Sequence, residues 1–227
     1  MGGRGSNGSG GGSQNVYTVT TQSGDTITLN NPLVYSADKK AGLLQSQKDA
    51  LDRFYGRHKG SKIEYGVLID GKGNIILEKR GGRGTVGMPM SDYNRAFVQE
   101  HLHPRGKGEE AQIGGTFSKG DLQTFADTYI RTMRAAAYEG TYSITKASGF
   151  DPIKFIQFQK NMHEETQKKY KSQDAAVGKL LLNGSITYDE YEKARNMNFN
   201  NYLVDRHNAL LAGQKAYGYT YGLERRN

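Results

Sequence analysis

The sequence contains no cysteine, few apolar residues and no long apolar run. Without cysteine the chain forms neither disulfide bonds nor a thiolate metal site, a composition that fits a reducing cytoplasm. No segment approaches the roughly 20 apolar residues that span a bilayer, and the N-terminus lacks the apolar core of a secretory signal. We therefore expect a cytoplasmic protein with no membrane partner.

Polar and basic residues dominate instead. Hydrophobic residues make up 35% of the 227 residues and the mean hydropathy is −0.74, enough for one modest core and an appendage. The net charge is +8, with a basic, glycine-rich segment at residues 79–84 and further charge at Arg105 and Lys107. Such charge could attract an acidic protein or give salt-sensitive binding to nucleic acid, although no nucleic-acid-binding motif accompanies it.

The most informative motif is His-Leu-His-Pro at residues 101–104. Residues 96–100 before it are typical of a strand, and Pro104 would end that strand because it cannot donate to the ladder. Alternate side chains of a strand lie on one face, so His101 and His103 would project to the same side. This arrangement suits two ligands of a single metal ion.

A second motif, Ser-Lys-Gly-Asp at residues 118–121, supplies a carboxylate. Ser118 has the character of a helix N-cap, which places Asp121 in the first helical turn. A serine followed three residues later by an acid is also close to a capping box, which is a purely structural feature. Together with the two histidines, Asp121 favours a site for Zn2+ with one open coordination position, as in catalytic zinc sites.

A hydrolytic zinc site also needs a carboxylate outside the ligand set that exchanges a proton with water. The upstream candidates are Glu64, Glu78 and Glu100. Glu64 opens an apolar, strand-like segment at residues 62–70, although a solvent-exposed strand end would also explain a glutamate there. Glu100 is expected to point away from the face that carries the two histidines.

The chain contains, in order, Glu64, the His-x-His-Pro motif and the Ser-x-x-Asp motif. This order resembles the signature of the JAB/MPN (JAMM) metalloproteases. The motif sequences are most similar to those of the branch found in phage head-morphogenesis and mobile-element proteins. The resemblance covers roughly residues 62–146. It implies hydrolysis of a peptide or isopeptide bond by a metal-activated water, in the cytoplasm of a bacterial host or phage-infected cell.

The resemblance also implies a role for each matching residue. Zinc ligands would be His101, His103 and Asp121. Glu64 would be the general acid/base and Ser118 the donor that stabilises the oxyanion of the tetrahedral intermediate. One feature departs from the family, because the spacer between the second histidine and the serine, residues 104–117, is longer and rich in glycine and charge. Closure entropy grows slowly with loop length, so such a spacer is compatible with the site but would affect substrate access.

The remaining pattern predicts an α/β (α+β) fold with a mixed sheet. Residues 1–15 are typical of a flexible Gly/Ser-rich tail, and residues 16–60 predict a β-hairpin and a helix. Residues 61–149 predict the JAB/MPN-like metal-binding domain, in the order strand, strand, strand, short helix, strand, strand. Residues 150–227 predict a helical C-terminal extension.

This extension is expected to be a helical hairpin. Asp151 followed by proline is typical of a helix start, residues 183–185 of a break, and Thr187 with Glu190 of a capping box. Aromatic residues along the helices favour a packing face, against the sheet or in a homodimer. That aromatic stripe is expected to continue to the end of the chain at Tyr217, Tyr219 and Tyr221. The remaining histidines, His58, His163 and His207, are interpreted as surface or packing residues.

Three functional hypotheses follow. The first is a zinc-dependent peptidase or isopeptidase that acts on a protein or peptide. The second is a phage head-morphogenesis or assembly module that contacts phage structural proteins through a non-catalytic fold of the same type. The third is a metal-dependent nuclease or nucleic-acid binder, which the basic charge favours but which lacks the Asn and distal His that such a metal site normally needs.

Overall fold

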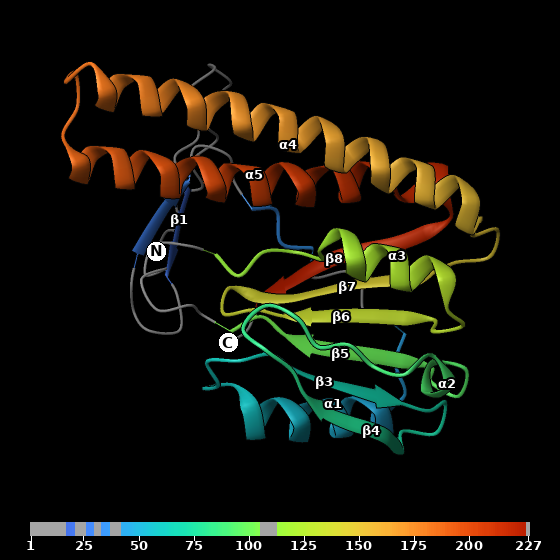
Figure 1. Ribbon diagram of the computed structural model, residues 1–227. Helices are drawn as coiled ribbons and strands as arrows, with labels where there is room; N and C mark the ends of the chain where they lie inside the picture. The colour runs from blue at the N-terminus through green and yellow to red at the C-terminus, as the bar shows by residue number, and fades with distance from the viewer. Residues whose placement is uncertain (1–16, 21–25, 30–32, 37–41, 105–112, 226–227) are drawn as a thin grey trace, which may run out of the picture.

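A computed structural model describes residues 17–20, 26–29, 33–36, 42–104 and 113–225 (Figure 1). The predicted tail at residues 1–15 and the basic residues Arg105 and Lys107 lie outside these ranges. The described elements are, in order, β1 (Tyr17–Thr20), β2 (Thr26–Leu29), α1 (Gln45–His58), β3 (Tyr65–Ile69), β4 (Ile75–Arg80), α2 (Met90–Tyr93), β5 (Val98–Leu102), α3 (Lys119–Asp127), β6 (Thr132–Ala136), β7 (Gly140–Lys146), α4 (Pro152–Leu182), α5 (Tyr188–Tyr217) and β8 (Tyr219–Arg225).

The centre of the fold is a six-stranded mixed sheet in the order β4-β3-β5-β6-β7-β8, and β1 and β2 form a separate antiparallel hairpin. β5 lies inside the sheet, antiparallel to β3 and parallel to β6, while the other neighbours pair antiparallel. All five residues of β5 are buried, because helices cover both faces of the sheet. The predicted α+β class with a mixed sheet is confirmed, as are the N-terminal hairpin and the helix after it.

Successive side chains of β3 lie on opposite faces of the sheet, and the core is therefore divided into two layers. Val67 and Ile69 belong to the layer that α1 covers with Leu51 and Phe54. Leu68, between them in sequence, belongs to the layer that α3, α4 and α5 cover. Residues of β5 alternate in the same way, so the face of β5 that carries His101 lies on the side of α3.

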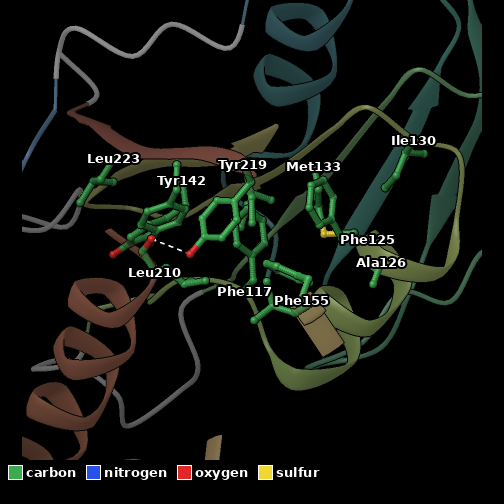
Figure 2. Close-up of a cluster of buried hydrophobic side chains, with 14 of the residues drawn as sticks. Phe117, Phe125, Ala126, Ile130, Met133, Tyr142, Phe155, Leu210, Tyr219 and Leu223 are labelled. Carbon is green, nitrogen blue, oxygen red and sulfur yellow. Dashed lines mark hydrogen bonds between the residues drawn. The ribbon is translucent and has the colours of Figure 1, made fainter. Parts of the chain in front are cut away.

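An aromatic cluster holds the helical hairpin on the sheet (Figure 2). Phe155 of α4 lies between Phe125 of α3 and Tyr219 of β8, with ring centroids 5.6 and 5.3 Å away. All three side chains are buried, and burying a side chain of this size contributes about 1.5–3 kcal/mol. Of the two packing alternatives considered for the hairpin, the structure therefore shows packing on the sheet of the same chain.

Local sequence signals explain where the two long helices begin. The Asp151 carboxylate accepts from the backbone N–H of Ile153 and Lys154, 3.0 and 3.1 Å away, and Thr187 forms the predicted capping box with Glu190. The helices run side by side next to β8, and their connecting turn projects beyond the end of the sheet (Figure 1). Among the described residues, no helix is both long and apolar enough to cross a membrane.

The expectation that the aromatic stripe of the hairpin includes Tyr219 and Tyr221 is wrong. α5 ends at Gly218, whose φ of 70° is left-handed, and the chain then returns to the sheet as β8. A Cβ atom at Gly218 would lie 2.6 Å from the Gly149 carbonyl oxygen, so the tight return needs glycine. Tyr219 and Tyr221 alternate with exposed or small residues at the period of a strand, and that short pattern was too weak to separate from the end of the helix.

Candidate metal centre

Strand geometry brings the two histidines of the first motif together. His101 lies in β5 opposite Gly66 of β3, and His103 follows the end of β5, where its N–H donates to the Ala136 carbonyl at 2.9 Å. The Nε2 atoms of His101 and His103 are 2.9 Å apart. The two imidazoles thus share one side of the strand, as the alternation of side chains predicts.

The start of α3 adds the carboxylate. Ser118 Oγ accepts from the Asp121 N–H at 3.2 Å, and Asp121 Oδ2 accepts from the Ser118 N–H at 2.7 Å, which completes the capping box. The same Oδ2 atom lies 3.6 Å from His101 Nε2. One potential ligand atom from each of His101, His103 and Asp121 lies within 4.8 Å of the others. The capping box therefore fixes the carboxylate that faces the imidazoles, and the structural and metal-site interpretations are compatible.

Hydrogen bonds fix the tautomer of His103. Its Nδ1 lies 3.0 Å from both the Gly114 and the Gly115 carbonyl oxygens. Because carbonyl oxygens only accept, Nδ1 carries a ring proton, and Nε2 is the nitrogen that faces His101. An imidazole held by its other nitrogen is the usual arrangement of a metal-binding histidine.

The charge states also suit a cation. Burial lowers the pKa of His101, so this imidazole is neutral at neutral pH. Burial alone would raise the pKa of Asp121, but the two imidazoles and the hydrogen bonds with Ser118 outweigh it and lower that pKa. A neutral His101 imidazole and an ionised Asp121 carboxylate need lose no proton to bind a divalent ion. The Nε2 atoms of His101 and His103 are 2.9 Å apart, close to the roughly 3.3 Å that separates two nitrogen ligands of one tetrahedral zinc ion.

Glu64 lies immediately before β3 and is buried, with 8% of its surface exposed. Its N–H donates to the Gly82 carbonyl at 2.7 Å and its carbonyl accepts from Gly81 at 2.8 Å, which extends the pairing of β3 with β4. The alternative of a solvent-exposed strand end is therefore wrong. Burial raises the pKa of Glu64 to about 7, with the imidazole of His103 opposing and the charge of Asp121 assisting this rise.

The other two candidate carboxylates are engaged elsewhere. Glu78 pairs with Arg57 and, at 2.6 Å, with His58. Glu100 accepts from Arg134 Nε at 2.6 Å, on the face of β5 opposite His101, as predicted. Glu64 is thus the candidate acid/base whose charge interacts with the metal centre.

Ser118 is exposed at the N-terminus of α3. Since its Oγ accepts the Asp121 N–H, the hydroxyl hydrogen is directed elsewhere and is available to donate. This geometry is compatible with a donor to a substrate oxygen bound beside Asp121.

Several residues around the site belong to no sequence motif. Tyr93 of α2 is buried, and burial together with the charge of Asp121 raises its pKa to about 12. Met88 and Val86 cover Gly66, where a Cβ atom would lie 2.2 Å from Met88 Cε. Only Phe117, whose ring centroid is 6.3 Å from that of His101, adjoins a recognised motif. These side chains form an apolar surround for the polar cluster.

The three remaining histidines have structural partners. His58 stacks on Tyr65 with ring centroids 3.9 Å apart, and His163 Nδ1 lies 3.2 Å from a nitrogen of Arg206. His207 is fully buried. All three therefore agree with the interpretation as packing or surface residues.

Comparisons with known proteins do not assign the chain. A scan against protein-family models and searches of curated proteins and of solved structures found no match. The chemistry of the candidate metal centre is therefore the basis for inferring a function.

Proposed function

We propose that this protein is a zinc-dependent peptidase or isopeptidase of the JAB/MPN type. The observation that carries the proposal is the convergence of the ligand atoms of His101, His103 and Asp121 within 4.8 Å, beside the buried carboxylate of Glu64. Imidazole and carboxylate without thiolate suit zinc, and three protein ligands leave a position for water or substrate. The order of these residues in the chain matches the metalloprotease signature.

His101, His103 and Asp121 would hold a zinc ion, which when bound would polarise the scissile carbonyl and lower the pKa of a water molecule. Glu64 receives a proton from the attacking water at its carboxylate and passes it to the leaving amine. A carboxyl with a pKa of about 7 is suited to both steps at neutral pH, because it exists in both protonation states. Ser118 donates its hydroxyl hydrogen to the oxyanion.

The expected substrate is a protein or peptide, and phage structural proteins are the expected partners if the resemblance to the head-morphogenesis branch extends to function. A non-catalytic assembly module would keep the same fold and the same ligands. These two hypotheses differ in one respect, which is whether Glu64 and the metal centre hydrolyse an amide bond.

The test compares the wild-type full chain, Glu64→Gln and Glu78→Gln on fluorescently labelled casein and on an isopeptide-linked fluorogenic peptide. We expect cleavage by the wild type and a decrease of at least ~10²-fold in Glu64→Gln, because the variant cannot exchange the proton. Zinc content should remain unchanged. Glu78→Gln removes a carboxylate outside the site and should retain activity.

The outcomes separate the hypotheses. Loss of zinc in Glu64→Gln would make Glu64 a ligand, and unchanged turnover would transfer the acid/base role to another residue. If the zinc-loaded wild type cleaves neither substrate, the assembly-module hypothesis is favoured.

A further inference from the structure

The turn between β6 and β7 contains a buried carboxylate, Glu139, behind the candidate metal centre; 3% of its surface is exposed. We infer that Glu139 is a positioning residue for His103 and acts through the backbone of Gly114 and Gly115. This inference rests on the proposed metal site, because His103 is one of its ligands.

The first link joins the carboxylate to the loop. Glu139 Oε2 accepts from the Gly114 N–H at 2.9 Å, and Oε1 accepts from the Gly115 N–H at 2.8 Å. Oε1 also accepts from the Tyr142 hydroxyl at 2.7 Å. Burial, with a smaller effect of the Glu139 charge, raises the pKa of Tyr142 well above its usual range, so this hydroxyl remains a donor. Two successive backbone N–H groups are thereby held towards one carboxylate.

The second link joins the loop to the ligand. The carbonyl oxygens of the same two glycines lie 3.0 Å from His103 Nδ1. Gly114 and Gly115 therefore connect Glu139 on one side with the imidazole on the other. A negative charge behind a peptide group strengthens the carbonyl as an acceptor, and a strong acceptor at Nδ1 raises the basicity of Nε2.

Glycine is required for this close fit. A Cβ atom at Gly114 would lie 2.6 Å from the Cβ of Ala137, and one at Gly115 would lie 2.9 Å from a methyl group of Leu203. Gly115 also has a φ of +76°, which favours glycine. The loop thus passes between the β6–β7 turn and α5 with no space for a side chain.

Neighbouring residues hold the loop without contacting His103. Asn200 of α5 accepts from the Ile113 N–H at 3.1 Å, and Arg206 donates to the Phe117 carbonyl at 2.6 Å. The Tyr221 hydroxyl and Thr116 Oγ1 form a hydrogen bond of 2.8 Å. These bonds keep the loop backbone near its place when Glu139 is changed. A variant at Glu139 therefore tests how the loop orients the His103 imidazole, and not whether the loop folds.

The test is the zinc affinity of the full chain, measured by competition with a chromophoric chelator, for wild type, Glu139→Gln and Glu100→Gln. The amide nitrogen of glutamine is a donor facing a backbone N–H, so the loop carbonyls should lose their alignment with Nδ1. We expect the zinc Kd of Glu139→Gln to rise about 10- to 100-fold. Glu139→Asp, which keeps the charge, should recover part of the affinity.

Glu100→Gln is the matched control, since Glu100 is an equally buried carboxylate whose side chain lies on the opposite face of β5. It should lower thermal stability but leave the zinc Kd unchanged. An unchanged Kd in folded Glu139→Gln, or an equal rise in Glu100→Gln, would overturn the inference. If Glu139→Gln does not fold, Gly114→Ala takes its place with the same expected rise and the same contradicting result.

A second readout does not depend on zinc. The imidazole 15N shifts of the metal-free protein should show the proton of His103 on Nδ1 in wild type, and a mixture of tautomers in the Glu139 or Gly114 variant. If the wild type binds no zinc, the proposed function fails, while the tautomer still decides whether Glu139 positions His103. An unchanged tautomer in the variant would contradict the positioning role.

Discussion

His101 and His207 are both buried imidazoles in the layer between the sheet and helices α3 to α5, with 2% and 0% of their surface exposed. Both ring nitrogens of His207 have partners, since Nδ1 lies 2.8 Å from the Tyr221 hydroxyl and Nε2 lies 3.0 Å from the Val34 carbonyl. His101 differs. Within the described residues its Nδ1 has no hydrogen-bond partner, and its Nε2 faces another imidazole and a carboxylate.

The difference distinguishes a structural histidine from a candidate ligand. Buried polar atoms are nearly always paired, and His101 Nδ1 is an exception, although Nε2 is the nitrogen that faces His103 and Asp121. Both ring nitrogens of His207 have hydrogen-bond partners within this chain. The region of His101 instead gathers three potential metal ligands, with His101 Nε2 2.9 Å from His103 Nε2 and 3.6 Å from Asp121 Oδ2, as expected of a site that binds an ion.

The largest expected effect on stability comes from replacing each histidine by alanine in the metal-free protein. His207→Ala leaves a cavity and removes the partner of the Tyr221 hydroxyl, so it should lower the free energy of unfolding by about 3–4 kcal/mol. His101→Ala also leaves a cavity, but it removes a buried Nδ1 that has no partner among the described residues, so it should cost less, about 1–2 kcal/mol. Urea unfolding in EDTA measures both, and equal losses would remove the distinction between the two regions.

The pH dependence sharpens the comparison. Burial lowers the pKa of His207 from 6.5 to about 4. Because the folded-state pKa is the lower one, neutral His207 stabilises the fold above pH 6.5, and this contribution is lost as pH falls through 4. We expect it to amount to about 3 kcal/mol. Unfolding of metal-free wild type and His207→Gln between pH 7 and 4 should show that the wild type loses about 3 kcal/mol more than the variant, because His101, whose pKa burial also lowers, is present in both. Parallel curves would contradict the assignment.

The smallest expected effect separates the two roles of the α3 capping box. Ser118→Ala removes the acceptor of the Asp121 N–H and should lower the free energy of unfolding by about 1 kcal/mol, while zinc content is retained. Asp121→Asn keeps an acceptor for the Ser118 N–H but loses the ligand charge, so it should weaken zinc binding more than stability. Calorimetric unfolding and zinc titration of both variants provide the measurement. Zinc loss in Ser118→Ala would show that the cap and the site cannot be separated.

Much of the fold was predictable because its signals are local. Strand alternation at His101 and His103, the cap at Ser118 and the caps of both long helices depend on residues a few positions apart. β8 was missed because Tyr219 and Tyr221 offer only a short alternation after a long helix. The contacts of Glu139 with Gly114 and Gly115, and the effect of the Asp121 charge on the pKa of Tyr93, join segments distant in sequence and carry no motif, so only the structure reveals them.

Metal content of the purified full chain tests the central claim most directly. After loading with zinc and removal of excess ion, wild type and His207→Gln should each contain about one zinc per chain. The double variant His101→Ala/His103→Ala should contain none, although it remains folded by circular dichroism. Full zinc occupancy in the double variant, or no zinc in the wild type, would contradict the assignment of His101, His103 and Asp121 as a metal centre.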